Sequence, residues 1–219
     1  IDYENCLVGI VTVDDAMFVL QDEVTEDIQI MAGVSPNEES YFGTSVLQHA
    51  KNRIFWLLFL MLSATVSGLL LAHYEDAMAV MPVLTTFIPM LMGVGGNSGS
   101  QSSTLIIRGL AVGEVEMKDV LRVVFKEVRI GLVVGILLAV VNGVRVWLMY
   151  GHNLMLCLAL GITIIAIVCI AKSIGCTLPL IAKRLGMDPA IMAAPLISTI
   201  LDTCSLLVYF RVVTLFFHL

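Results

Sequence analysis

The chain has 219 residues, of which 58% are hydrophobic and only 14% are charged, whereas about a quarter of the residues of a typical soluble domain are charged. Its formal net charge is −6. This balance indicates a membrane protein, and it argues against nucleic-acid binding and against a secreted scaffold held together by disulfides.

The net charge is distributed unevenly along the chain. Residues 1–39 hold ten Asp and Glu and no Lys or Arg, whereas residues 40–219 hold twelve Lys and Arg against eight acids. An acidic N-terminal arm therefore precedes a mildly basic membrane body. The cysteines are odd in number and show no Cys-x-x-Cys spacing, so we interpret them as small core residues rather than metal ligands or disulfide partners. They are Cys6, Cys157, Cys169, Cys176 and Cys204.

The arm begins with a β-branched run, residues 7–13, that favours a strand, and residues 14–22 and 25–31 favour helices. Thr12 and Asp15 have capping-box spacing. One strand with one or two helices does not bury a core alone, so we interpret the arm as the end of a larger cytosolic domain. The absence of an initiating Met fits a piece of a longer protein, and no signal peptide is visible.

The arm and the membrane body are joined by a turn at Ser35, Pro36 and Asn37 and by an amphipathic stretch, residues 41–52. We therefore divide the chain into residues 1–34, the end of a cytosolic domain; residues 35–52, a connecting or plug segment; and residues 53–219, the membrane domain.

The body contains five runs that are long and apolar enough to cross a bilayer as helices, since about 20 apolar residues span the hydrocarbon core. The second run is longer than one span needs, and Pro82, Pro89 and a Gly/Ser-rich stretch interrupt it. We predict an all-α membrane protein with five transmembrane helices. The runs are residues 54–72, 77–107, 130–150, 154–182 and 189–217.

The Lys and Arg near the span ends indicate the orientation, because cytoplasmic loops carry an excess of them. Nine would lie on the side of the arm, whereas Arg145 and Arg211 lie opposite, where residues 73–76 are acidic. We expect a multi-pass protein of the cell (inner) membrane with its N-terminus in the cytoplasm and its C-terminus outside. The nine are Lys51, Arg53, Arg108, Lys118, Arg122, Lys126, Arg129, Lys183 and Arg184.

Asp202 lies well inside the last predicted helix, where an ionised carboxylate that faces lipid costs about 2.5–3.5 kcal/mol. It should therefore face a water-filled path or a partner. The structural alternative is a protonated or ion-paired Asp202 that joins helices, for example through Lys172. Four more polar side chains share its helix face: Ser198, Thr199, Ser205 and Tyr209.

The second span ends in a Gly/Ser-rich stretch in which Asn97, Gln101, Thr104 and Arg108 follow at i, i+4, i+7 and i+11. Small and hydroxyl residues also join membrane helices, so a purely structural role stays open. Neutral oxygens together with one carboxylate favour a hard cation that keeps much of its water, such as Mg²⁺. No His or Cys cluster favours a softer metal.

An intramembrane protease is the tempting alternative, because Gly96-Asn97-Ser98-Gly99 matches a Gly-x-Ser-Gly motif. A serine nucleophile needs a base, however, and all four histidines fall near span ends or in connections. The predicted spans contain no second Asp that could form the catalytic pair of an aspartyl protease with Asp202. We therefore expect that the protein is not an enzyme.

Residues 95–111 resemble the signature of the MgtE magnesium channels, as do residues 185–190 and the segment that contains Pro195, Thr199, Asp202 and Tyr209. Residues 9–15 and 25–28 are similar to the last strand and helix of that family's second CBS domain. The resemblance implies a homodimer in the lipid bilayer, with an ion path on the dimer axis lined by the second and fifth helices. It also implies preceding cytosolic N and CBS domains that sense Mg²⁺.

By this resemblance Asp202 corresponds to a pore carboxylate that holds a largely hydrated Mg²⁺. Ser198 and Thr199 lie on the same helix face as Asp202, so we expect them to line the pore as well. Ser100 stands where close relatives would carry an amide. The pore-side motif of the second helix corresponds to Asn97, Ser100, Gln101 and Thr104.

The family's cytosolic regulatory positions correspond to Glu4, Asp14, Glu38 and Asp188, whereas Ser35 replaces another expected acid. Asp188 also has the position of an N-cap before Pro189, and the two roles are compatible. The structural alternative for the whole arm is a solvated acidic surface.

The expected function is a passive Mg²⁺-selective channel for Mg²⁺ uptake. Rising cytosolic Mg²⁺, which is regulator as well as substrate, would bind the acidic arm, draw Glu38 and residues 41–52 toward Asp188, and close the inner mouth. One alternative is a secondary divalent-cation transporter coupled to Na⁺ or H⁺, in which Lys172 titrates. A second is a non-transporting membrane-anchored sensor, which the facing polar stripes of the second and fifth helices disfavour.

Overall fold

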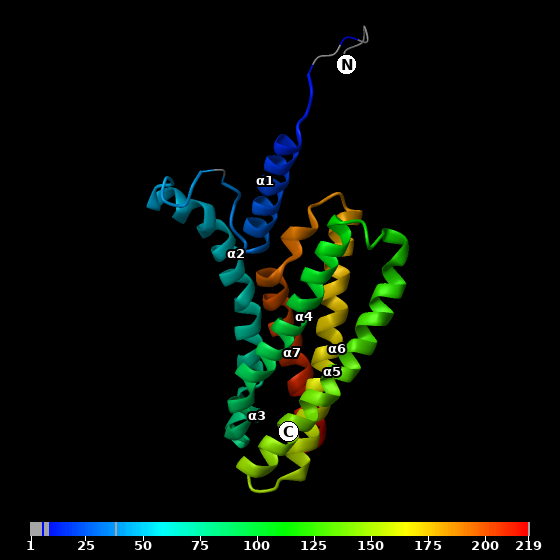
Figure 1. Cartoon of the computed structure of the whole chain (residues 1–219). Coiled ribbons are helices and arrows are strands. Elements are labelled where there is room, and N and C mark those ends of the chain that lie inside the picture. The colour runs from blue at the N-terminus through cyan, green and yellow to red at the C-terminus, as the bar shows by residue number, and fades with distance from the viewer. Residues whose placement is uncertain (1–5, 7–8, 38, 219) are drawn as a thin grey trace.

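The computed structural model describes residue 6, residues 9–37 and residues 39–218. Within these residues every regular element is a helix, as Figure 1 shows. The elements are α1 Val13–Met31, α2 Val46–His73, α3 Glu75–Val80, the 3₁₀ helix η1 Pro82–Phe87, α4 Ile88–Ala111, the 3₁₀ helix η2 Met117–Asp119, α5 Val120–Met149, α6 Leu154–Arg184, the 3₁₀ helix η3 Pro189–Met192 and α7 Ala194–Phe217.

The N-terminus of α1 carries the predicted capping box. The Thr12 hydroxyl accepts from the Asp15 amide at 3.2 Å, and the Asp15 carboxylate accepts from the Thr12 hydroxyl at 2.7 Å and from its amide at 2.9 Å. These bonds, the hydroxyl first, lower the pKa of the Asp15 carboxyl. The two helices predicted for the arm are one continuous helix.

The predicted strand is absent from the part of its segment that the structure describes. Residues 9–12 form no regular element, and Val13 is already the first residue of α1. A strand needs a neighbour to pair with, and the described chain offers none. The remaining positions of this prediction, residues 7 and 8, lie outside the described residues.

The C-terminal end of α1 docks on the end of the helical bundle. Ile30 and Met31 pack against Ile107 of α4 and against Ala190 and Ala193, which lie in and after η3. This contact places the acidic helix beside the ends of α4 and α6, at the upper end of the molecule in Figure 1. The C-terminal end of α7 lies at the opposite end.

The predicted second span is divided where its prolines fall. Pro82 is the first residue of η1, and Pro89 lies in the first turn of α4, where its missing N–H leaves no helical hydrogen bond unmade. The residues before Pro82 form the short helix α3. As a result, α4 carries the Gly/Ser-rich stretch through the middle of the bundle.

The helix α6 lies at the centre of the bundle, in contact with α4, α5 and α7 (Figure 1). α2 packs along α7, where the hydroxyls of Ser67 and Thr203 lie 2.7 Å apart. The largest core cluster lies toward the end opposite α1 and includes Leu84, Phe87, Leu160, Leu206, Tyr209 and Phe210.

Four helical segments among the described residues are long and apolar enough to cross a membrane: Val46–His73, Met117–Met149, Leu154–Arg184 and Pro189–Phe217. The 24-residue helix α4 runs among them and is less apolar, because Gly, Ser, Asn and Gln occupy its middle. The all-helical membrane fold is therefore as predicted. The fifth span, which would be α4, stays a prediction.

Candidate functional site

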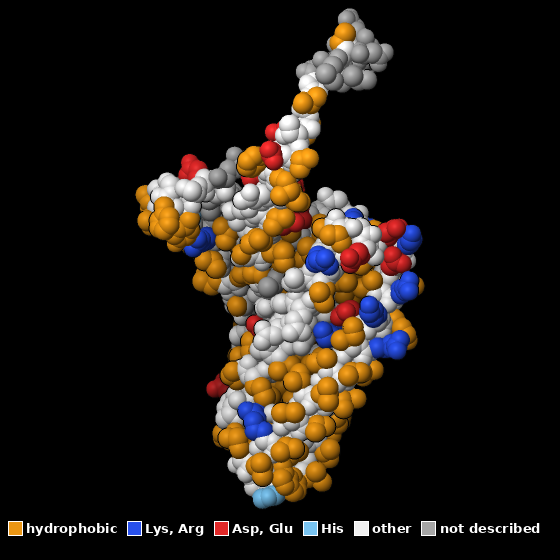
Figure 2. Space-filling view, in the orientation of Figure 1, with side chains coloured by type: hydrophobic (Ala, Val, Ile, Leu, Met, Phe, Trp, Pro, Cys, Tyr) orange, Lys and Arg blue, Asp and Glu red, His pale blue; other side chains and the backbone are white. Residues whose placement is uncertain are grey.

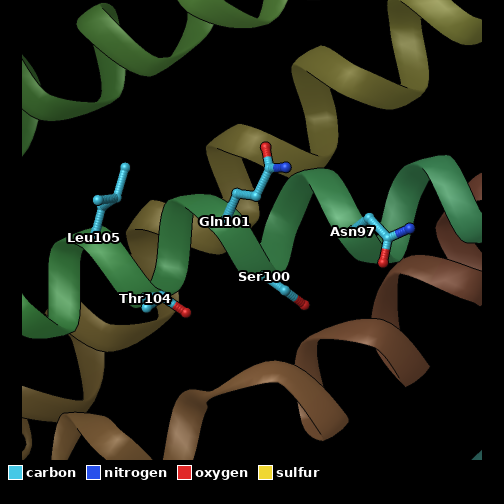
Figure 3. A pocket seen from close by; sticks show the side chains of 5 residues that line it. All are labelled: Asn97, Ser100, Gln101, Thr104 and Leu105. Carbon is cyan, nitrogen blue, oxygen red and sulfur yellow. The ribbon is translucent and has the colours of Figure 1, made fainter.

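One face of α4 carries the polar residues predicted to line an ion path. Their side chains line a surface cavity of about 670 Å³, and all but Ser100 are exposed. Figure 3 shows Asn97, Ser100 and Thr104 pointing toward the side where α7 passes, whereas Gln101 points the other way with Leu105. The structure thus brings together all four predicted residues of α4: Asn97, Ser100, Gln101 and Thr104.

The opposite face of α4 is a glycine surface that packs against α6 and α7. A Cβ atom at Gly175 of α6 would overlap the backbone carbonyl of Gly99, and a Cβ at Gly99 would overlap Leu201 of α7. A Cβ atom at Gly95 would likewise overlap the hydroxyl of Ser205 of α7. The small residues of this segment therefore do join helices, as the structural alternative proposed, while the polar side chains on the other face stay open.

The polar stripe of α7 divides into two parts. Tyr209 is buried and donates its hydroxyl to the Leu84 carbonyl at 2.8 Å, and Ser205 is buried with no hydrogen-bond partner in the described structure. These two side chains belong to the core rather than to a path. Nearer α1, Ser198 and Thr199 are partly exposed. Ser198 packs beside Gly96, and the Thr199 hydroxyl donates to the Pro195 carbonyl at 3.0 Å.

Asp202 is half-buried in the middle of α7. Among the residues that the structure describes, its carboxylate has no hydrogen bond and no ion pair. Asp202, Ser198 and Thr199 are not among the side chains that line the α4 cavity. The structure therefore brings the α4 residues together and leaves the α7 residues on a neighbouring surface.

Lys172 pairs with Glu127 instead of with Asp202. Both side chains are buried, at 5% and 7% exposure, and the Lys172 Nζ lies 3.9 Å from the Glu127 carboxylate. Ser102 of α4 lies between them: it donates to Glu127 at 2.5 Å and accepts from Lys172 at 3.3 Å. Sequence reasoning missed this cluster because Glu127 precedes the apolar run of α5 and looked like a residue outside the membrane.

At the other end of the site, Asp188 caps η3, since its carboxylate accepts from the Ala190 amide at 2.8 Å. The predicted N-cap is confirmed. A cavity of about 190 Å³ lies beside it, lined by Asp27 of α1, Asp188 and Lys183 together with apolar side chains of α4. Burial raises the pKa of the Asp27 carboxyl, and the nearby carboxylates of Asp188 and Glu23 raise it further.

Asp27 is the residue at this end that sequence reasoning did not single out, although it lies in the Thr25-Glu26-Asp27-Ile28 segment. Asp14 is exposed in the first turn of α1, and Glu4 and Glu38 lie outside the described residues. Within the described ranges, no three His, Cys, Asp or Glu side chains converge as a metal site. The regulatory assignments therefore stay predictions.

The family model MgtE, described as a divalent cation transporter, matches residues 88–212, which hold α4 to α7 almost completely. The chain belongs to the MgtE family. The resemblance inferred from the α4 motif is thereby confirmed, and so is the expectation that the protein is not an enzyme, since the family consists of cation transporters.

Three curated relatives extend the MgtE match over nearly the whole chain, and each is named a magnesium transporter. The protein of Thermus thermophilus is 38% identical and aligns with 98% of this chain. The protein of Bacillus subtilis is 35% identical over 100% of the chain, and that of Enterococcus faecalis is 33% identical over 98%. The alignments cover 47%, 48% and 47% of these relatives, so the chain spans about half their length.

Proposed function

We propose that this chain is the membrane domain of a passive Mg²⁺ channel for Mg²⁺ uptake across the cell (inner) membrane. The observation that supports it most is the combination of an open polar face on α4 with a carboxylate on α7, Asp202, that has no partner in the described structure. The choice of Mg²⁺ as the ion follows from the names of the three relatives, each of which is called a magnesium transporter.

The side chains on these two helices suit a hydrated Mg²⁺. Mg²⁺ prefers oxygen ligands and loses its water reluctantly, so it binds through one or two carboxylates while it keeps several waters. The α4 face offers amide and hydroxyl oxygens, and α7 offers the Asp202 carboxylate. Selectivity would then depend on charge and pore width rather than on a dry cage.

A second copy of the chain completes the proposed path. Polar side chains that face lipid are unfavourable, so the open face of α4 and the half-buried Asp202 need a cover within the membrane. A homodimer with its axis along α4 and α7 covers both and places two Asp202 carboxylates at the path. The membrane potential would drive Mg²⁺ inward with about 4.6 kcal/mol per 100 mV, twice the value of about 2.3 for a single charge.

The cavity beside η3 supports closure by cytosolic Mg²⁺, with the N-terminus in the cytoplasm. Burial raises the pKa of the Asp27 carboxyl most, and repulsion by the Asp188 carboxylate raises this pKa further. A divalent cation between them would relieve this repulsion and hold α1 against the ends of α4 and α6. In this proposal Asp188 both caps η3 and binds Mg²⁺, whereas Glu4, Asp14 and Glu38 contribute from the rest of the arm.

Reconstituted liposomes that contain a Mg²⁺-sensitive dye test the passive mechanism. With Na⁺ concentration and pH equal on both sides, an inside-negative potential set by K⁺ and valinomycin should suffice for Mg²⁺ entry. Entry that requires a Na⁺ or H⁺ gradient would instead support the coupled transporter. No entry under any gradient would support the membrane-anchored sensor.

A further inference from the structure

A row of three basic side chains follows one face of α5 at the end of the bundle where α1 docks. Arg122, Lys126 and Arg129 are spaced i, i+4 and i+7, which places them on one side of the helix, and all three are exposed. Two large apolar side chains accompany them, Leu121 at 84% exposure and Phe125 at 66%. Figure 2 shows Lys and Arg over the upper end of the bundle, with Asp and Glu among them, whereas the lower part of the bundle is mostly hydrophobic.

No Asp or Glu forms an ion pair with these three side chains within the described structure. The exposed ion pairs at this end use other cations, Arg108 with Glu114 at 3.8 Å and Lys118 with Glu116 at 2.7 Å. Glu127, the one acid within α5, is buried and turned toward Ser102 and Lys172. Among residues 122–129, the exposed charged side chains are therefore all Lys or Arg. The Arg129 guanidinium lies 5.7 Å from the centre of the Phe125 ring, which orders the two side chains together.

The length of α5 places the row at the height of lipid headgroups. Its 30 residues extend about 45 Å, whereas the hydrocarbon core is about 30 Å thick. Residues 130–149 are enough to span that core, and Arg145 is their only charged residue. The turns with the basic row then lie in the headgroup layer, with Arg129 next to the hydrocarbon core and Leu121 farthest from it.

We propose that Arg122, Lys126 and Arg129 bind the headgroups of anionic phospholipids. Three cations on one face, none of them in an ion pair in the described structure, complement the phosphates, and the exposed Phe125 beside Arg129 adds apolar surface in the headgroup layer. Lipid phosphate, rather than an acidic protein segment, fits a surface that combines cations with exposed apolar side chains on a membrane helix. This surface is separate from the proposed Mg²⁺ path, so a failure of either proposal leaves the other standing.

The test compares two charge-matched double variants of the whole chain, purified in detergent and titrated with phosphatidylglycerol or phosphatidylcholine. Native mass spectrometry counts the bound lipids. The parent should retain phosphatidylglycerol in preference to phosphatidylcholine. Arg122→Gln with Lys126→Gln should weaken that retention on the order of tenfold, since each cation near an anionic lipid surface contributes severalfold. Arg108→Gln with Lys118→Gln, which removes the same charge from paired residues, should bind like the parent.

A charge-conserving variant keeps the test decisive if the neutral variant folds poorly. Arg122→Lys with Arg129→Lys should retain phosphatidylglycerol like the parent, because the headgroup phosphates meet the same charge. Equal retention of both lipids by the parent would overturn the proposal. So would unchanged retention by the Arg122→Gln, Lys126→Gln protein, or displacement of the lipid by inorganic phosphate at equal concentration.

Discussion

At the residue scale, Asp188 combines two roles that a single substitution can separate. Its carboxylate caps η3, and it also faces Asp27 across a small cavity. Asn caps helices about as well as Asp but has no charge, so Asp188→Asn removes only the charge. Asp188→Ala removes both the cap and the charge.

We predict that Asp188→Asn and Asp27→Asn each raise the internal Mg²⁺ concentration needed for closure about tenfold, because a charged contact contributes about 1.5 kcal/mol or more. Asp188→Ala should show the same shift and also lose about 1 kcal/mol of stability. Dye-loaded liposomes with graded Mg²⁺ on the arm side, together with thermal unfolding, measure both effects. Glu114→Gln, at the same end, is the control. If Asp188→Asn closes at the same Mg²⁺ concentration as the parent, the Asp188 carboxylate has no role in closure.

At the element scale, the buried Ser102, Glu127 and Lys172 join α4, α5 and α6 at one point. The removal of one partner of a buried ion pair leaves an unpaired charge, whereas the replacement of both partners by neutral groups of similar volume often has little effect. Since Ser102 lies on the face of α4 opposite the open polar face, this cluster orients the residues of the proposed path.

We predict that Glu127→Gln and Lys172→Met each lower stability by about 3–5 kcal/mol, and that the double variant recovers most of the loss. Thermal unfolding in one lipid mixture, with a double-mutant cycle, measures the coupling. Single variants that unfold like the parent, or a double variant no more stable than the weaker single one, would show that the pair does not hold the helices.

The contact between α4 and α6 depends on Gly99 and Gly175. Gly175→Ala should force the helices apart and cost about 1–3 kcal/mol or more, because the new Cβ would overlap the Gly99 carbonyl, which belongs to backbone and does not move away easily. Gly143→Ala is the matched control, since in the described structure no neighbouring helix comes within 4 Å of a Cβ there. Thermal unfolding of the two variants measures the difference, and equal stability would contradict the close contact.

At the scale of the whole molecule, the sequence predicts what depends on local pattern. Apolar runs located the long helices, Pro82 and Pro89 marked the break before α4, and the Asp188-Pro189 pair predicted the cap. The contacts between distant segments were not predictable in this way. Glu127 and Lys172 meet because α5 and α6 pack side by side, and no periodicity in one segment reports its partner in another.

The same limit explains the errors in the arm and the missed residue in it. The strand predicted at residues 7–13 depended on a neighbouring strand that the described chain lacks. Asp27 faces Asp188 because α1 docks on η3, a contact between residues far apart in sequence. The family motif on α4, by contrast, is contiguous, so its helical spacing is enough to predict the polar face.

The central claim is that Mg²⁺ passes the carboxylate of Asp202. The most direct test measures voltage-driven Mg²⁺ entry into liposomes that contain the parent, Asp202→Asn, Asp202→Ala or Asp76→Asn. Asp76→Asn is the matched control, because Asp76 is an exposed acid on α3. Loss of the intramembrane charge should reduce entry about tenfold or more in both Asp202 variants and leave the control unchanged. Parental rates of Mg²⁺ entry in Asp202→Asn and Asp202→Ala would contradict the account.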